Sequence, residues 1–120
     1  MEMTGVMRNG KEIAVAYSAK PVMIDARTAL DFFMSAQYQH SHAIVINKEA
    51  FSDDFFDLKT GVAGEILQKC VMYRIKLAIY GDFSVYTSKA LQDFIRESNR
   101  GKDIFFLPSK EEAVERLAAV

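Results

Sequence analysis

The stretch that decides the fold is Ala43–Tyr80, AIVINKEAFSDDFFDLKTGVAGEILQKCVMYRIKLAIY. It opens with Ala43–Ile46 and closes with Leu77–Tyr80, two short apolar runs typical of strands that are covered on both faces. Between them, a helix that begins near Lys59 carries apolar residues at three-and-four spacing: Ala63, Ile66, Leu67, Cys70 and Val71. This order of strand, helix and strand predicts a right-handed crossover between two parallel strands.

Upstream of this unit, the sequence predicts a β-hairpin and then a helix. Thr4–Arg8 and Lys11–Tyr17 are joined by Asn9-Gly10, a pair that tolerates positive φ at both central turn positions. The helix is expected from Asp25, whose carboxylate can cap it. Its inward stripe comprises Ala26, Ala29, Leu30, Phe33 and Met34. Phe32 and Tyr38 lie off that stripe, so we expect them to be available for a contact surface.

Downstream, the alternation of helix and strand continues. A helix is predicted to begin among Ser84–Ser88 and to turn Leu91, Phe94 and Ile95 inward, and Ile104–Leu107 is a further buried strand. Ser109 and Glu112 fit a capping box at the start of a last amphipathic helix. The order ββαβαβαβα predicts an α/β fold in which the hairpin feeds a mixed, mostly parallel five-stranded sheet with four helices. We expect residues 1–120 to form one domain.

Composition narrows the classes of protein to consider. The chain has 120 residues, half of them apolar and about a quarter charged, as in an ordinary globular domain. Its net charge of −1 gives no reason to expect nucleic acid or an anionic membrane as a partner. The first ten residues lack the apolar core of a signal peptide, so we expect a cytoplasmic protein. The single Cys70 excludes an internal disulfide, and its place on the apolar face of a helix favours a buried structural thiol over a reactive one.

The predicted topology gathers polar residues at one edge of the sheet. Parallel strands joined by crossovers present their C-terminal ends at the same edge, and open α/β sheets tend to bind ligands there. The second and third helices also begin at this edge. The candidate residues for binding a ligand or partner are Asn47, Lys48, Asp57, Lys59, Thr60, Gly61, Asp82, Ser84 and Lys89.

The predicted helix start at Lys59-Thr60-Gly61 favours anions. The first amides of a helix lack partners within the helix, and the helix dipole places partial positive charge there, to which Lys59 adds a full charge. Gly61 and Gly64 are unfavourable in a helix interior, which indicates close approach by a ligand or a neighbouring element. The alternative is that Asp57 only caps the helix while the glycines allow it to pack tightly.

Other patterns point to no reaction. His40 and His42 have the spacing of possible metal ligands but lack a third, so solvated turn residues are the better interpretation. Asp53, Asp54 and Asp57 offer oxygen ligands, yet Phe55 and Phe56 between them favour a loop that docks apolar side chains. Gly61-Val62-Ala63-Gly64 has the GxxG form of one RNA-binding module, but it lies in a helical pattern after an acidic loop. We therefore assign no catalytic residue, metal or cofactor.

Almost the whole chain resembles a known family. The segments NGKEIAV, IVINKEAF and FFDLKTGVAGEILQKCVMYRIKLAIYGDFSVYTSKALQDFIRESNRGKDIFFLPSKEEA are similar to the uncharacterised bacterial family called domain of unknown function 4180. The resemblance implies a cytoplasmic bacterial protein and brings no established activity.

The element order also resembles STAS domains, the fold of sulfate transporters and anti-sigma-factor antagonists. In that family a strand leads to a D-S-[ST]-G turn at a helix start, where a partner kinase phosphorylates a serine. Asp57-Leu58-Lys59-Thr60-Gly61 occupies the comparable place, so the resemblance implies Thr60 as a phosphoacceptor. The turn departs from the pattern: its spacing is longer, Lys59 replaces a small polar residue, and threonine replaces serine.

Three functions follow from these patterns. The first is a non-enzymatic regulatory or binding module that works through Asp57–Gly61 with a protein partner. The second is an anion-binding protein or small enzyme that uses Lys59 with Asp57 or Asp82, for which Lys59 must be buried. The third is a self-associating structural domain or homodimer, in which the aromatic residues Phe32, Tyr38, Phe55 and Phe56 form the subunit interface.

Overall fold

The computed structural model describes all residues from Met1 to Val120 and has the predicted order of strands and helices. Short 3-10 helices (η) interrupt two of the loops. The elements are β1 Glu2–Arg8, β2 Lys11–Tyr17, α1 Ala26–Gln39, β3 Ala43–Asn47, η1 Lys48–Ala50, η2 Asp53–Phe56, η3 Leu58–Thr60, α2 Val62–Met72, β4 Lys76–Tyr80, η4 Phe83–Val85, α3 Lys89–Arg100, β5 Ile104–Leu107 and α4 Lys110–Ala119.

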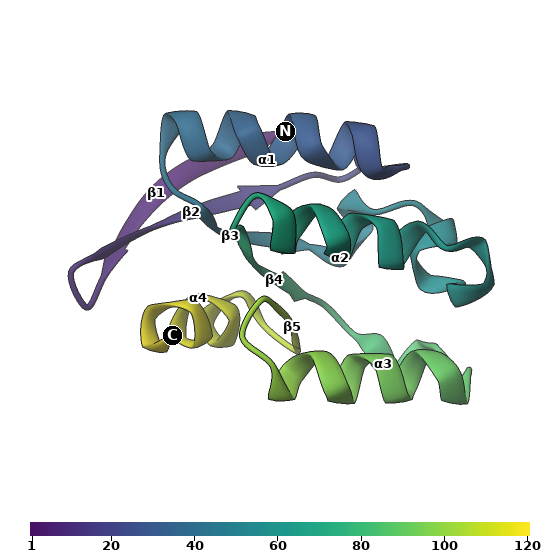
Figure 1. Cartoon of the computed structure of the whole chain (residues 1–120). Coiled ribbons are helices and arrows are strands. Elements are labelled where there is room, and N and C mark those ends of the chain that lie inside the picture. The colour runs from purple at the N-terminus through teal and green to yellow at the C-terminus, as the bar shows by residue number, and fades with distance from the viewer.

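The five strands form one sheet in the order β1-β2-β3-β4-β5. β1 and β2 are antiparallel, and every later pair is parallel. Asn9 and Gly10 both have positive φ, 51° and 76°, as a tight hairpin turn requires. The predicted hairpin and the mostly parallel sheet are therefore confirmed. Figure 1 shows the hairpin turn and the loop that carries η1, η2 and η3 at opposite ends of the sheet.

The two faces of the sheet carry separate apolar clusters. α1, α2 and α3 pack on one face, because all three are crossovers of the same hand between neighbouring parallel strands. α4 follows the last strand and packs on the other face, where Ala113, Val114 and Leu117 meet Val45 and Phe105. Because both faces are covered, β3 and β5 are buried along their whole length.

Three helix starts follow the sequence signals for capping. The carboxylate of Asp25 accepts a hydrogen bond from the Thr28 amide at 2.9 Å. The hydroxyl of Ser88 accepts from the Leu91 amide, and that of Ser109 accepts from the Glu112 amide at 3.2 Å. These contacts satisfy amides that have no partner within their own helix.

The predicted aromatic interface is wrong. Phe32, Phe55 and Phe56 are all buried, and only Tyr38 is exposed, at 93%. Phe32 packs edge-on against Phe33, and η2 turns Phe55 and Phe56 into the core, where their rings are 4.9 Å apart. The burial of Phe55 and Phe56 agrees instead with the other interpretation of this run, a loop that docks apolar side chains.

One residue of the predicted α2 stripe also differs. Ala63, Ile66 and Cys70 are fully buried, but Val71 is 54% exposed. The face of α2 that meets the sheet is therefore narrower than the pattern indicated. Burial raises the pKa of the Cys70 thiol to about 12, with a smaller contribution from Asp103. A structural role for Cys70 agrees with this burial.

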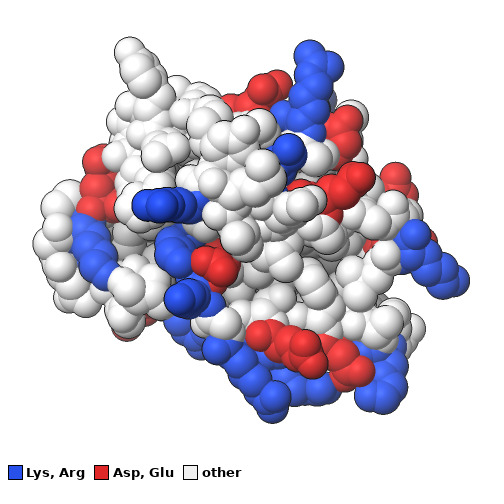
Figure 2. All heavy atoms as spheres, in the orientation of Figure 1, with Lys and Arg blue, Asp and Glu red and all other residues white.

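The surface mixes the two signs of charge. Figure 2 shows Lys and Arg side chains interspersed with Asp and Glu over one face of the molecule, with no broad region of a single sign. None of the helices combines the length and the hydrophobicity that a membrane span needs.

Candidate functional site

The C-terminal ends of the parallel strands bring Asn47, Lys48 and Asp82 to one edge, as predicted. In the β3–β4 ladder Asn47 lies opposite Tyr80, so the residues that follow each strand emerge side by side. The loop after β3 is held against the loop after β2, because Val22 and Met23 both donate to the Ala50 carbonyl, at 2.8 and 3.0 Å. These two loops therefore lie side by side at this edge of the sheet.

Hydrogen bonds within the fold occupy the side chain of Asn47. Its side chain accepts from the Ser18 amide at 2.9 Å and donates to the Ser18 carbonyl at 2.7 Å. It also donates to a Glu49 carboxylate oxygen. The residue is 1% exposed, so its amide group is not available to a ligand. Asn47 fastens the end of β2 to the end of β3.

Lys48 is the cation that the edge holds in place. A Cβ atom on Gly81 would lie 2.7 Å from Cγ of Lys48, so the glycine leaves the room that the lysine stem occupies. Further along, the Lys48 ammonium lies 4.8 Å from the centre of the Tyr86 ring and 3.4 Å from its hydroxyl. Gly81 and Tyr86 thus fix the two ends of the side chain, and a cation over an aromatic ring is a stabilising arrangement.

Lys48 lines a cavity of about 300 Å³, which we call the Lys48 cleft. Its other lining residues come from the β2–α1 loop, the segment after β3, and the turn before α3; they are Ala19, Pro21, Glu49, Phe51, Asp53, Phe56 and Tyr86. The Phe56 and Tyr86 rings stack 4.7 Å apart and 11° from parallel. The cleft therefore combines aromatic walls with a fixed cation.

The charge of Lys48 is not neutralised by an ion pair. Four ion pairs and the His40–Glu12 contact join other side chains, and none of them includes Lys48. Asp82 is near, but its carboxylate accepts from the Ser84 hydroxyl and amide, at 2.5 and 3.0 Å. These two hydrogen bonds lower the pKa of Asp82, and Lys48 adds a smaller effect of the same sign. Asp82 and Ser84 form a closed turn beside the cleft.

The start of α2 differs from its prediction. A separate turn of 3-10 helix, η3, ends at Thr60, and Gly61 then caps α2 in the left-handed conformation at φ 81°. Asp57 accepts from the Lys59 amide and so caps η3 rather than α2. The Thr60 hydroxyl lies 2.6 Å from the Asp54 carbonyl and 2.8 Å from the Asp57 carbonyl, to which it donates. Thr60 holds this double turn together.

The other residues of the predicted helix-start site stand apart. Lys59 is exposed and lines none of the cavities, so it lacks the burial that activation of a lysine needs. A Cβ atom built on Gly64 would meet nothing within 4 Å. The expectation that a neighbouring element approaches Gly64 closely is therefore wrong.

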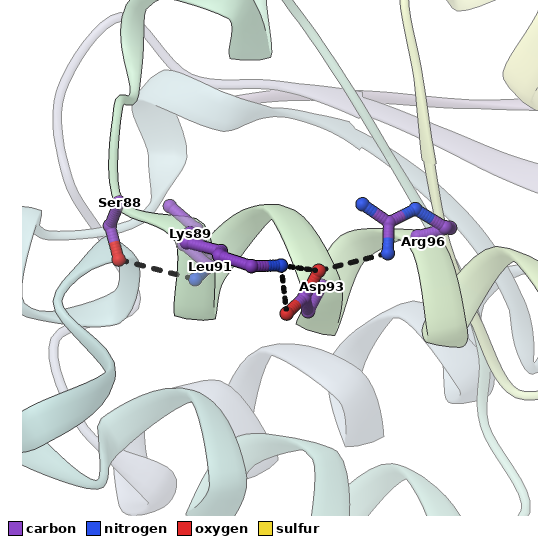
Figure 3. Close-up of polar contacts among 5 residues, drawn as sticks. All are labelled: Ser88, Lys89, Leu91, Asp93 and Arg96. Atoms are coloured by element: carbon purple, nitrogen blue, oxygen red, sulfur yellow. Dashed lines mark hydrogen bonds and ion pairs between the residues drawn. The ribbon is translucent and has the colours of Figure 1, made fainter.

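Lys89 points along α3. Its ammonium pairs with Asp93 at 3.2 Å, and Arg96 pairs with the same carboxylate at 2.8 Å (Figure 3). Hydrogen bonds from Arg96 and Lys89 lower the pKa of Asp93. The structure thus directs Lys89 to its own helix rather than to the polar edge.

The largest cavity, about 510 Å³, lies at the opposite end of the parallel strands. Polar side chains in its lining already have partners: His40 and Glu12 are hydrogen-bonded at 3.1 Å, and Lys76 pairs with Asp103 at 2.8 Å. His40 is therefore not the solvated turn residue that the sequence predicted, whereas His42 is exposed. The His40–Glu12 pair lies over Gly5, where an added Cβ atom would collide with the glutamate oxygen. This pair ties the hairpin to the end of α1.

Comparison with known proteins gives a family. The family described as Domain of unknown function (DUF4180) matches residues 8–117. The chain belongs to this family. No curated protein and no solved structure matches it, so the likeness to STAS domains stays a prediction.

Of the residues that line the Lys48 cleft, the sequence predicted only Lys48 itself; it missed Tyr86, and also Gly81, which leaves room for the Lys48 stem without lining the cleft. Gly81 directly follows a predicted strand, where a glycine is ordinary, and Tyr86 lies in an irregular turn that gives no periodic pattern. The positive φ of Gly81, 156°, is the feature that its identity as glycine could have signalled. No sequence signal links Tyr86 to Lys48, 38 residues away.

Proposed function

We propose that this domain is a non-enzymatic binding module whose working surface is the Lys48 cleft. The single observation that carries the proposal is the fixed ammonium of Lys48, which is positioned by Gly81 and Tyr86 and has no carboxylate partner. A half-buried ammonium group that is held in one geometry without an ion pair is expected where a bound molecule supplies the anion. The cleft lies at the edge of the sheet where open α/β folds bind ligands.

The lining of the cleft supports one class of ligand. Lys48 suits a carboxylate or phosphate group, and the faces of Pro21, Phe51 and Tyr86 suit an aromatic or apolar part of the same ligand. The volume of about 300 Å³ fits one ring with its substituent or one side chain of a peptide. An aromatic anion, either free or at the tip of a partner protein, meets both requirements.

The test is a nuclear magnetic resonance titration of the ¹⁵N-labelled protein with phenyl phosphate and with inorganic phosphate. Phenyl phosphate should shift the amide signals of Lys48, Phe51, Asp53 and Tyr86, and inorganic phosphate should bind more weakly. Lys48→Met should weaken phenyl phosphate binding about tenfold or more, since a contact with a charged group contributes about 1.5–3 kcal/mol.

Lys59→Met is the matched control, because Lys59 is a nearby exposed lysine outside the cleft. It should leave phenyl phosphate binding unchanged. Equal binding by wild type and Lys48→Met would refute the proposal. If instead Lys59→Met removed binding and the shifts centred on Val62–Glu65, the ligand site would be the start of α2, as the sequence alone predicted.

Regulation through Thr60 remains a separate proposal. The Thr60 side chain is exposed, and its hydroxyl donates to the turn that joins η2, η3 and α2. Phosphorylation would remove that donor and place about two negative charges beside the exposed Lys59. Thr60→Glu should therefore alter the amide signals of Asp54–Gly61, and transmission to the cleft would appear as a changed affinity for phenyl phosphate. An unchanged affinity in Thr60→Glu would argue against a switch at this residue.

A further inference from the structure

The two edge strands of the sheet differ in whether their outward backbone groups already have hydrogen-bond partners. At the β5 edge, the Asn99 side chain donates to the Phe106 carbonyl at 3.1 Å and accepts from the Phe106 amide at 2.7 Å. Arg116 in turn donates to the Asn99 carbonyl. Asn99 thus occupies the place where another strand would pair. A strand edge that is covered in this way is protected against pairing with another chain.

The β1 edge is open. β1 is the outermost strand, and Glu2, Gly5 and Met7 on it are exposed. In a hairpin with a two-residue turn, the residues on either side of the turn exchange both hydrogen bonds, and this pattern repeats at every second residue. Since Arg8 lies opposite Lys11, the amides and carbonyls of Met3, Gly5 and Met7 point away from β2. The one side-chain hydrogen bond to this row is from Arg8 to the Met7 carbonyl, at 3.3 Å.

The sequence of β1 is complementary to a second copy of β1 that runs in the opposite direction. β1 is Glu2-Met3-Thr4-Gly5-Val6-Met7-Arg8. If two copies lie antiparallel about Gly5, Glu2 of each copy faces Arg8 of the other, and Met3 faces Met7. Thr4 and Val6, which have nearly the same shape, also face each other. The same alignment pairs all the outward amides and carbonyls, because Met3, Gly5 and Met7 are the residues that meet.

Burial supports the same register. Met7 is 62% exposed in one copy, and Met3 packs against the cluster that lies under α1. In the antiparallel pair, Met3 of the second copy would cover Met7 on that face of the sheet. Glu2 and Arg8 would meet on the other face, on which Val6 packs against the cluster of α4. Cross-strand pairs of opposite charge, and apolar pairs, are the contacts that stabilise such ladders.

We propose that two copies of this chain associate through antiparallel β1 strands centred on Gly5, so that the two sheets join into one. The interface is isologous, as in most homodimers, since each end of the strand meets the opposite end of its copy. Arg8 then exchanges its contact with its own Met7 carbonyl for the carboxylate of the second copy's Glu2. This surface does not overlap the Lys48 cleft, which lies beyond the other end of β2.

The test uses charge reversal at the two ends of β1, measured by sedimentation of untagged protein. Wild type should sediment at twice the 13.6 kDa of one chain at high concentration. Glu2→Arg alone and Arg8→Glu alone each set like charges opposite each other at both ends, and each should raise the dissociation constant at least tenfold. The double variant Glu2→Arg with Arg8→Glu should regain the wild-type constant.

Mixing the two single variants provides the sharpest outcome. Each has like charges at both ends of β1, of opposite sign in the two proteins, so the mixture should form a heterodimer that neither protein forms alone. Circular dichroism melting serves as the folding control, because within its own chain Arg8 has only two exposed contacts to lose, the 3.3 Å hydrogen bond to the Met7 carbonyl and the 3.7 Å pair with Glu111. Monomeric wild type at millimolar concentration would overturn the proposal. A dimer indifferent to the single reversals, or not restored by the double variant or the mixture, would also overturn it.

Discussion

Replacing Asn47 with leucine tests how strongly one buried amide ties two strands together. Leucine has nearly the same volume and shape, so the change removes hydrogen bonds without opening a cavity. It leaves the amide and the carbonyl of Ser18 without partners, and Ser18 is only 5% exposed. Each unpaired buried group costs about 1–3 kcal/mol, so for the two groups we expect a loss of about 2–6 kcal/mol. That is a large part of the roughly 5–15 kcal/mol by which a domain is stable.

The assay is urea unfolding followed by far-ultraviolet circular dichroism. With a slope of about 2 kcal/mol per molar urea, a loss of 3 kcal/mol lowers the unfolding midpoint by about 1.5 M. Asn99→Leu is a matched control, because Asn99 makes the same two types of contact to Phe106 but is only half-buried at the edge of the sheet. Water can replace its contacts, so the loss should be about 1 kcal/mol. If Asn47→Leu were within 0.5 kcal/mol of wild type on the same scale, this reasoning would be refuted.

Three further predictions concern single residues. Gly64→Ala should stabilise the fold by about 0.5–1 kcal/mol, since Gly64 has free space around it and a helical backbone. Gly61→Ala should destabilise the fold by about 1 kcal/mol, because Gly61 has a positive φ. Equal effects of the two substitutions in urea unfolding would contradict this reasoning. Cys70, whose pKa is raised to about 12, should react with a thiol reagent at pH 8 only as fast as the protein opens, and immediate reaction of the native protein would contradict its burial. The pKa of Asp93 lies below its usual value of 3.8, so the stability it contributes is present above about pH 4 and lost as the pH falls further. Asp93→Asn should flatten the fall in melting temperature below that pH, and an unchanged acid profile would count against the ion pairs.

Most of the fold was predictable from local patterns. Asn9-Gly10 sets a turn, Asp25, Ser88 and Ser109 cap helices, and short apolar runs are typical of strands that are covered on both faces. Each of these signals acts within a few residues, where backbone geometry and hydrogen bonding decide the structure. The connection rule for parallel strands then fixes the arrangement, because crossovers of one hand put α1, α2 and α3 on the same face.

The loop between β3 and α2 was harder to predict, because contacts far along the chain decide it. Phe55 and Phe56 turn inward to meet Phe51, Phe106 and Tyr86, which lie in other elements. No periodicity within Asp53–Phe56 reports such partners.

The topology predicts which edge of the sheet carries Lys48 and Asp82, but the sequence does not predict which side chains remain free at that edge. The edge of the sheet follows from topology, so Lys48 and Asp82 were identified correctly as residues of that edge. Which side chains remain free there depends on individual hydrogen bonds, and these occupy Asn47, Thr60 and Lys89. Only the three-dimensional structure shows that Lys48 alone among these candidates reaches the cleft.

A crystallographic screen with small aromatic carboxylates and phosphates would test the central claim most directly. It asks where such molecules bind without assuming a site. The Lys48 cleft should be occupied, with the anionic group on the Lys48 ammonium and the ring between Pro21 and Tyr86. Occupation of the larger cavity beside His40 and His42 instead, with the Lys48 cleft left empty, would contradict the claim.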